Sequence, residues 1–363
     1  MTGNVKRRLV IAAAVLTTAM LTAAPVEAQP APPAADGYPW RQLMVDTGRE
    51  YFPIDWLEAR VRELSALGMN TLHLHLSDNQ GFRLRSDTHP EVNSAQTYAK
   101  DEIRALVTYA DSYGITVVPE IDMPSHMGQI LTHHPELQLV PAHTTPLEAQ
   151  QDSLLGGPAT KIDLSNPAPY RLMGDLLREF LPLFPGPYWH LGADEYVSDF
   201  GRYPQLSPYA VRDYITWASG ILGPAGKTPI VWNDGLNWTG PLGLDPSVIV
   251  DYWSAGTAPW IRTGRAPAEL AANGNRLVNA GFTPTYFVTG GPAAGLNTPP
   301  ALLELWNPRI FVDLSTLPES SRPQLIGSGI FVWCDDPTAM TPDEISAPLS
   351  ERLAIMAARL RTR

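Results

Sequence analysis

The chain alternates short apolar runs with longer stretches of helical periodicity along most of its length. Each apolar run has the length of a buried strand, and each stretch between the runs is long enough to return the chain to the start of the next strand. The predicted strands are Leu43–Val45, Leu72–Leu76, Thr116–Val118, Tyr188–Leu191, Ile230–Trp232, Val248–Tyr252, Arg276–Asn279 and Gly329–Trp333. The predicted helices are Asp55–Leu67, Lys100–Tyr113, Tyr170–Phe184, Tyr209–Ile221, Ala266–Ala272 and Pro348–Leu360. This repeat predicts an α/β fold with a parallel sheet.

Polar residues closely follow most of the predicted strands. They are Asp46, Asp78, Glu120, Asp194, Asn233 and Asp335. In a (β/α)8 TIM barrel the ends of all strands share one rim, and active sites are built there. We therefore predict such a barrel as a single catalytic domain over residues 39–363, with an open, doubly wound sheet as the alternative. The irregular stretch from Met123 to about Asp163 would lie on the same rim as a candidate lid.

The first 28 residues have the features of a secretory signal peptide. Three basic residues at positions 6–8 precede the apolar run Leu9–Ala24, and Val26-Glu27-Ala28 supplies the small residues of a cleavage site. The run is short for a membrane span, and an uncleaved N-terminal anchor is the alternative. We expect a secreted protein in which residues 29–38, rich in Pro and Ala, form a flexible leader.

The net charge limits the partners. It is −11 for the whole chain, and removing residues 1–28 takes away three positive charges and one negative charge, which leaves −13. A surface with this much negative charge repels nucleic acid and anionic lipid, and we therefore expect neither as a partner. A neutral or cationic polymer would be a suitable partner. Cys334 is the only cysteine, which excludes an intramolecular disulfide.

No cofactor is expected, because the sequence has no glycine-rich phosphate loop and no convincing metal-ligand spacing. His73 and His75 share one face of a predicted strand, but no third ligand stands at a suitable distance along the sequence. We interpret both as hydrogen-bonded core histidines.

Two adjacent carboxylates, Asp194 and Glu195, follow the predicted strand that begins at Tyr188. Where a strand ends, its alternation of side-chain directions is lost, so both groups can reach one cavity. Paired carboxylates ringed by aromatic residues are typical of glycoside hydrolysis. The chain carries ten Trp and thirteen Tyr, which supply ample aromatic surface.

Other residues with suitable chemistry lie near predicted strand ends. Trp232, Trp253 and Trp333 stand at the tips of three separate strands, where indole rings could wall a sugar site, although core packing accounts for any one of them. The segment Pro119–His126 places two acids and a histidine after a strand. Arg41 stands at the start of a strand, and a structural ion pair is the alternative for it.

Taken together, these segments resemble glycoside hydrolase family 20, the β-N-acetylhexosaminidases. The most specific segments are His190–Glu195, Leu72–Phe82 and Pro119–His126, and the resemblance extends from Trp40 to about Pro337. As a lone barrel, and in Val231–Leu236, the chain is most similar in layout to the single-domain dispersin-type enzymes of this family, which degrade poly-β-1,6-N-acetylglucosamine.

The resemblance implies a reaction without an enzyme nucleophile, in which the substrate's own 2-acetamido oxygen attacks the anomeric carbon and forms an oxazoline. Glu195 would be the general acid and then the base, with a pKa raised by burial and by the charge of Asp194. Asp194 would accept the acetamido N–H, and Tyr286 would donate to the acetamido oxygen. Further substrate-binding residues implied by the resemblance are Arg41, Asp78, Asp122, His126, Trp232, Trp253, Trp333 and Asp335.

Among these, Arg41 would bind the 3- and 4-hydroxyls, and the three tryptophans would wall the acetamido site. Asp78, Asp122 and His126 would tune the proton affinity of Glu195.

The chain departs from the family pattern at three positions. Ala193 replaces the second Gly of the usual His-Xaa-Gly-Gly-Asp-Glu, Asp335 stands where many members have Glu, and Val288 stands where larger members often have Asp. These differences affect the prediction of which sugar and which linkage the protein acts on more than the prediction of the reaction type.

We therefore expect a secreted retaining β-N-acetylhexosaminidase that acts on β-linked N-acetylglucosamine or N-acetylgalactosamine. The alternatives are a lacto-N-biosidase-like enzyme, an endo-acting poly-N-acetylglucosamine hydrolase, an enzyme with Asp194 as covalent nucleophile, and a catalytically silent sugar-binding barrel. The last has no need of an acid, yet Asp194 and Glu195 are both present.

Overall fold

The computed structural model describes residues 37–362 except 156, 198 and 256–263. The predicted signal peptide and nearly all of the predicted leader lie outside the described residues. No helix in the described ranges combines the length and the apolar character that crossing a bilayer needs.

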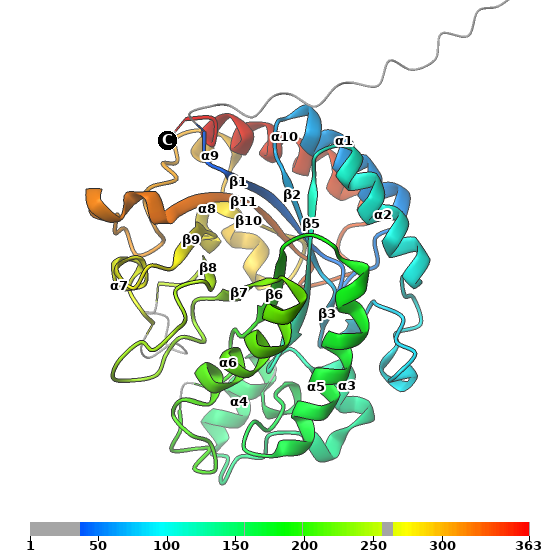
Figure 1. The fold of residues 1–363 in the computed structure, drawn as a ribbon, viewed down its shortest axis with the longest axis vertical. Coiled ribbons are helices and arrows are strands. Elements are labelled where there is room, and N and C mark those ends of the chain that lie inside the picture. Colours follow the sequence, from blue (N-terminus) through cyan, green and yellow to red (C-terminus); the bar gives the residue numbers. More distant parts are fainter. Residues whose placement is uncertain (1–36, 156, 198, 256–263, 363) are drawn as a thin grey trace, which may run out of the picture.

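A closed parallel barrel forms the centre of the fold (Figure 1). Its strands, in order around the barrel, are β1 (Trp40–Asp46), β2 (Thr71–His75), β5 (Thr116–Met123), β6 (Tyr188–Gly192), β7 (Thr228–Trp232), β8 (Ile249–Tyr252), β9 (Arg276–Asn279) and β11 (Leu325–Trp333). Strand β1 pairs with both β2 and β11, so the sheet closes on itself and the doubly wound alternative is excluded. The short strand β10 (Tyr286–Val288) adds to β11 near its C-terminal end.

Alternation along each strand divides the core into two layers. In β1, Trp40 and Met44 belong to the apolar cluster inside the barrel, whereas Leu43 and Val45 belong to the larger cluster between strands and helices. Both faces are therefore covered, and all seven residues of β1 are buried. This is why the strands read as short continuous apolar runs rather than as alternating patterns.

Helices surround the strands, as Figure 1 shows for α1, α2, α5, α6 and α10. Their bounds are α1 (Ile54–Ala66), α2 (Lys100–Ser112), α5 (Pro167–Phe180), α6 (Ala210–Leu222), α7 (Pro267–Ala272) and α10 (Pro342–Arg359). The remaining short helices are α3 (Gly128–His133), α4 (Pro146–Leu155), α8 (Phe282–Thr285) and α9 (Pro300–Leu303). The 3-10 turns are η1 (Pro90–Val92), η2 (Pro135–Leu137), η3 (Pro158–Thr160), η4 (Leu181–Leu183), η5 (Gly223–Ala225), η6 (Pro292–Leu296) and η7 (Glu319–Gln324).

The closing helix begins six residues earlier than predicted. The Thr341 hydroxyl accepts a hydrogen bond from the backbone N–H of Glu344, and the Glu344 carboxylate accepts from the backbone of Thr341. This capping box sets the start of α10 at Pro342, so Pro348 lies inside the helix instead of at its first position.

Two βα loops at the C-terminal end of the barrel have structure of their own. The loop after β2 contains the hairpin of β3 (Ser77–Asp78) and β4 (Gly81–Phe82), followed by η1. The stretch from Met123 to Asp163, which was predicted to be irregular, contains α3 and α4 and the turns η2 and η3. Its role as a lid stays a prediction.

Candidate active site

The structure brings most of the predicted site residues to one end of the barrel. Strand ends or the turns just after them supply these side chains: Asp78 from β3, Asp122 from β5, His126 after β5, Asp194 and Glu195 after β6, Trp232 from β7, Trp253 after β8, Tyr286 from β10, and Trp333 and Asp335 from and after β11. Because the eight barrel strands are parallel, their C-terminal ends all face the same rim, where β3 lies in the loop after β2 and β10 pairs with the end of β11.

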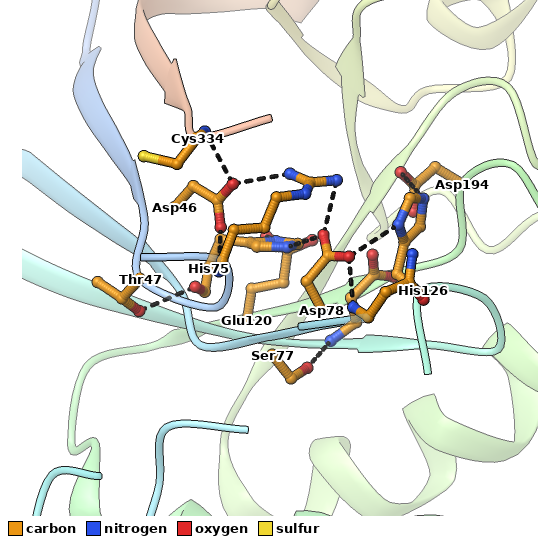
Figure 2. A network of polar contacts seen from close by, with 12 residues as sticks. Asp46, Thr47, His75, Ser77, Asp78, Glu120, His126, Asp194 and Cys334 are labelled. Carbon is orange, nitrogen blue, oxygen red and sulfur yellow. Dashed lines mark hydrogen bonds and ion pairs between the residues drawn. The ribbon is translucent and has the colours of Figure 1, made fainter. Parts of the chain in front are cut away.

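His126 joins the two adjacent carboxylates. Its Nε2 atom lies 3.4 Å from Oδ2 of Asp194 and 3.3 Å from Oε2 of Glu195. Its Nδ1 atom lies 3.3 Å from Oδ1 of Asp78, and Figure 2 shows Asp78 between His126 and His75. Three acidic side chains from two segments of the chain thus converge on one imidazole.

These acids control the charge of His126. Burial alone would lower the pKa of His126, but the negative charges of Asp78 and Asp194 outweigh burial and raise this pKa well above its usual value. A protonated His126 therefore lies between Asp194 and Glu195 at neutral pH.

The same proton overturns the expectation of a raised Glu195 pKa. Burial would raise this pKa, but the hydrogen bond and positive charge of His126 outweigh burial and lower the pKa of Glu195. Asp194 behaves as the opposite case, because burial raises its pKa more than His126 lowers it, and the charge of Glu195 adds to the increase. In the free protein the proton between these two groups thus rests on His126 rather than on Glu195.

Asp194 and Asp122 have unused hydrogen-bonding capacity. Oδ1 of Asp194 is buried and has no hydrogen-bond partner among the described residues, and the same is true of both carboxylate oxygens of Asp122. Burial and the nearby charge of Asp194 raise the pKa of Asp122 well above its usual value. A buried acceptor without a partner costs free energy, and a ligand N–H can relieve that cost.

The backbone between β6 and Glu195 is left-handed at three positions. The φ angles are 71° at Gly192, 72° at Ala193 and 47° at Glu195. A Cβ on Gly192 would lie 1.7 Å from Oδ1 of Asp122, so this position requires glycine. Ala193 adopts a conformation that costs a non-glycine residue about 1–2 kcal/mol, which explains the glycine of the family pattern.

Arg41 is not part of this site, and its prediction is wrong. Arg41 lies at the N-terminal end of β1, where its guanidinium donates to the backbone carbonyls of Gly68, at 2.7 Å, and of Tyr38. The other arginine of this segment, Arg49, follows the C-terminal end of β1 and does reach the site. Its guanidinium lies 2.7 Å from Asp46 Oδ2.

Arg49 also contacts two residues that the sequence placed in the site. Its Nη2 lies 2.8 Å from Oδ2 of Asp78, and its guanidinium lies 5.2 Å from the ring centre of Trp333. The signal that would have identified Arg49 is its position just after the C-terminal end of β1, because Arg41 at the other end of the same strand lies away from the rim. Asp335 also lies at this end of the barrel. Its side chain keeps access to solvent, and partial desolvation raises its pKa although the charge of Arg49 opposes the increase.

Four predicted aromatic residues form one connected cluster. Trp253 stacks on Tyr286 at 6.3 Å between ring centres, and Tyr286 lies 5.7 Å from Trp333. Trp333 in turn lies 5.8 Å from Trp232, which is fully buried. Burial, with the charges of Asp194 and Asp234, raises the pKa of Tyr286 well above its usual value, so its hydroxyl stays a donor.

Asp234 belongs to the site although the sequence analysis did not select it. Its Oδ2 accepts from the backbone N–H of Glu195 at 2.7 Å, and its Oδ1 accepts from the indole N–H of Trp253 at 2.8 Å. Burial, and then the charges of Asp194 and Glu195, raise its pKa to about 8. Asp234 follows the end of β7 in the same way that Asp194 follows β6, so the criterion that predicted Asp194 as a site residue could also have predicted Asp234.

Beneath the site, Glu120 contacts a group of buried side chains. Its carboxylate lies 3.0 Å from His73, 2.7 Å from His75, 3.0 Å from His190 and 2.8 Å from the indole nitrogen of Trp232. The interpretation of His73 and His75 as hydrogen-bonded core residues is confirmed. Burial would raise the pKa of Glu120, but charge interactions and hydrogen bonds with the neighbouring histidines hold it well below its usual value.

Several of these groups are close enough to hold a metal ion. In the barrel, the sets are His73–Glu120–His190, His75–Glu120–Asp122, Asp46–His75–Asp78 and Asp122–His126–Asp194. None of these sets contains both His73 and His75, and sequence spacing could not show them, because Glu120 comes from the neighbouring strand β5.

Comparisons with known proteins agree on one family. The family model described as "Glycosyl hydrolase family 20, catalytic domain" matches residues 38–304. A lacto-N-biosidase from Bifidobacterium bifidum is 26% identical over 306 residues, which cover 80% of this chain and 25% of that protein. A β-hexosaminidase subunit A1 from Dictyostelium discoideum is 30% identical over 236 residues, which cover 61% of this chain and 42% of that protein.

The fold also matches solved structures. The crystal structure of Dispersin B has a TM-score of 0.70 and 20% identity, with 88% of this chain and 99% of that chain covered. At this level of identity the match supports the barrel fold alone. The matched part of the chain covers less than half of the length of either curated relative, the lacto-N-biosidase or the β-hexosaminidase subunit.

Proposed function

The chain belongs to glycosyl hydrolase family 20, and on this basis we propose that it is a retaining β-N-acetylhexosaminidase that hydrolyses β-linked N-acetylglucosamine or N-acetylgalactosamine residues. One observation carries the proposal. Oδ1 of Asp194 is buried without a partner among the described residues, directly beside Glu195 and its proton store His126. An acceptor for an amide N–H and a proton donor thus stand side by side.

In the first half of the reaction the acetamido oxygen of the substrate attacks the anomeric carbon. Asp194 accepts the acetamido N–H and stabilises the positive charge that develops as the oxazoline ring closes. Tyr286, whose raised pKa keeps the hydroxyl protonated, donates a hydrogen bond to the acetamido oxygen. The C–O bond to the leaving group breaks as Glu195 gives its proton to that oxygen.

His126 supplies the proton that Glu195 lacks in the free protein. Substrate binding brings the glycosidic oxygen against Glu195 and displaces water, and both changes favour the neutral carboxyl group. The proton then passes from His126 to Glu195 over the 3.3 Å that separate Nε2 and Oε2. In the second half, Glu195 takes a proton from water as that water opens the oxazoline with net retention.

The surrounding side chains hold the sugar. Trp253, Tyr286 and Trp333 offer aromatic faces, and Trp232 forms the buried support on which Trp333 packs. Arg49 and Asp335, at the same end of the barrel, would bind sugar hydroxyls. Ring stacking and charged hydrogen bonds of this kind are typical of carbohydrate recognition.

We also propose that the protein is secreted after cleavage behind Ala28 and acts on an N-acetylhexosamine-containing glycan, without nucleic acid or membrane as a partner. The basic residues, apolar run and small residues of positions 1–28 support export, and the acidic net charge supports the choice of partner. N-terminal sequencing of the protein recovered from culture medium tests export.

The activity is tested with the nitrophenyl N-acetyl-β-glucosaminide and galactosaminide. Wild type should release nitrophenol well above the Glu195→Gln variant, which keeps the side-chain shape but cannot give or take the proton. Equal rates for the two proteins on several aryl and oligosaccharide substrates would contradict the proposal. Binding of these sugars without turnover in wild type would favour a sugar-binding barrel instead.

A second candidate activity is supported by the match to the Bifidobacterium bifidum lacto-N-biosidase, which covers 80% of this chain. An enzyme of that kind would release disaccharides, and an endo-acting enzyme would cut inside a polymer. Digestion of β-1,4 and β-1,6 N-acetylglucosamine oligomers side by side separates the three possibilities. The proposed exo-acting enzyme should release monosaccharide from the first time point.

A further inference from the structure

Two histidines and a glutamate converge on the surface, where two βα loops meet. His89 directly precedes η1, Glu91 lies within η1, and His134 follows the last residue of α3. Oε1 of Glu91 lies 3.2 Å from Nδ1 of His89 and 2.9 Å from Nε2 of His134. The three side chains are 19%, 38% and 22% exposed, so solvent ions reach them while the loops hold them in place.

We propose that His89, Glu91 and His134 form a binding site for a divalent transition-metal ion such as Zn²⁺. One ligand atom from each residue lies within 4.8 Å of the other two. Zn²⁺ binds imidazole nitrogen and carboxylate oxygen at about 2.0–2.2 Å, so the ligand atoms of a tetrahedral ion lie about 3.3–3.6 Å apart. Two of the three separations are already within a few tenths of an ångström of this range, and water would complete the coordination.

The outer nitrogens of both histidines lie near further carboxylates. Nδ1 of His134 makes a hydrogen-bond contact of 3.3 Å with Oε1 of Glu136. Nε2 of His89 is buried and has no hydrogen-bond partner among the described residues, and Oδ2 of Asp175 on α5 lies 3.5 Å from it. Histidines that bind metal nearly always donate their other ring N–H to a carboxylate, a carbonyl or water, which fixes the tautomer and directs the free nitrogen to the ion. In a simple surface ion pair, each histidine ring needs a carboxylate contact at only one of its two nitrogens. Here both rings have the inner contact with Glu91 and a carboxylate within 3.5 Å of the outer nitrogen.

This site is separate from the buried histidine and carboxylate groups of the barrel. Sequence spacing does not reveal it, because His134 lies 43 residues from Glu91 along the chain. An ion bound here would tie η1, in the loop that follows Asp78, to the end of α3, which begins just after His126. We therefore expect the ion to stabilise the fold rather than to take part in the reaction.

Titration calorimetry of the protein with ZnCl₂ near pH 7.5, after removal of any histidine tag, tests the proposal. Wild type should bind one ion with saturable affinity, and His134→Ala or Glu91→Gln should weaken binding at least tenfold. The outer variants Glu136→Gln and Asp175→Asn should weaken it about 10–100-fold. His133→Ala is the matched control, because His133 is an exposed neighbour of His134 outside the cluster, and its affinity should stay that of wild type.

Thermal unfolding gives a second measurement. At a Zn²⁺ concentration about 100-fold above Kd, the Tm of wild type should rise by about 3–4 °C, and that of His134→Ala should not change. Two results would overturn the proposal: no saturable binding to wild type, or equal binding by wild type and His134→Ala. Equal binding would belong to another site, such as one of the histidine and carboxylate groups in the barrel. None of these results depends on hydrolytic activity, so the proposal and the proposed function fail separately.

Discussion

Nε2 of His126 lies 3.3 Å from Oε2 of Glu195, and this contact joins the two groups that share a proton in the proposed reaction. The two residues come from different strands and are held by different loops, so neither the distance nor the charge is visible from either segment alone. The imidazole is the more basic partner, because Asp78 and Asp194 raise its pKa and because its charge lowers the pKa of Glu195. The free protein is therefore in the form histidinium and carboxylate, and substrate binding must reverse that distribution.

Replacing His126 should move the pH profile of kcat/KM. In wild type the alkaline limb reports loss of the shared proton and follows the raised pKa of His126. In His126→Asn only Glu195 can carry this proton, so the alkaline limb should move to lower pH, with kcat lowered about 10²-fold or more. The measurement is the pH dependence of aryl N-acetylglucosaminide hydrolysis. An alkaline limb at the wild-type position would contradict the proton store.

The two arginines of the first strand segment should have different effects. Arg41→Ala removes hydrogen bonds to Tyr38 and Gly68 at the far end of the barrel, so it should lower the Tm and leave kcat/KM within about twofold of wild type. Arg49→Ala leaves Asp46 and Asp78 without their charged partner at the site and should lower kcat/KM about 10–100-fold. Steady-state kinetics and thermal unfolding of both variants test this. Equal effects on kcat/KM would contradict the assignment.

Two single-methyl substitutions in the left-handed turn at the end of β6 should change the stability of the protein in opposite directions. Ala193→Gly relieves backbone strain and should raise the free energy of unfolding by roughly 0.5–1 kcal/mol, after the greater freedom of glycine in the unfolded chain is subtracted. Gly192→Ala places a Cβ 1.7 Å from Asp122 and should destabilise the protein and abolish activity.

Gly68→Ala is the matched control for these variants. Gly68 has a φ of 70°, nearly that of Gly192, but a Cβ there meets nothing within 4 Å. It should cost only about 1–2 kcal/mol, from the backbone conformation itself. Chemical denaturation measures all three variants. Equal destabilisation by Gly192→Ala and Gly68→Ala would show that contact with Asp122 is unimportant.

Stability in acid should depend on Glu179 of α5, outside the active site. Its carboxylate accepts hydrogen bonds from Ser86, at 2.6 Å, and Thr88 and contacts Lys100 at 2.6 Å. Burial would raise the pKa of Glu179, but Lys100 and the hydroxyl donors lower it to about 2. A lowered pKa gives stability that is complete above the unfolded-state value, near 4.5, and is lost as pH falls towards 2.

Glu179→Gln should therefore lower the Tm at pH 6 and have a smaller effect near pH 2, where about half of the wild-type carboxylate is protonated. Thermal unfolding across this pH range is the measurement. A Tm difference that does not change with pH would show that the ion pair and charged hydrogen bonds of Glu179 contribute nothing to stability.

The sequence predicted the barrel well because strands buried on both faces are short apolar runs. The eight predicted strands are the eight strands of the closed barrel. It ended β5 too early, at Val118, because Glu120 and Asp122 are polar, and a polar residue normally marks the end of a buried run. Here both side chains lie inside the barrel, and Glu120 meets His73, His75 and His190 there. No pattern within one segment encodes that network.

The site was predictable where its residues follow a strand, and less so elsewhere. Asp194, Trp253 and Trp333 were found in this way, whereas Arg41 was chosen at the wrong end of its strand and Asp234 was not selected. The sign of the Glu195 pKa shift was wrong, because the deciding charge on His126 comes from another strand.

The central claim is that the amide of the substrate performs the attack, with Asp194 holding its N–H. The most direct test compares the turnover of two aryl glycosides with the same leaving group, the N-acetyl-β-glucosaminide and the β-glucoside that lacks the acetamido group. Our account predicts that kcat/KM for the first exceeds that for the second by at least about 10³-fold, since the intramolecular nucleophile is lost in the second. Comparable turnover of both substrates would contradict it and favour Asp194 as a covalent nucleophile.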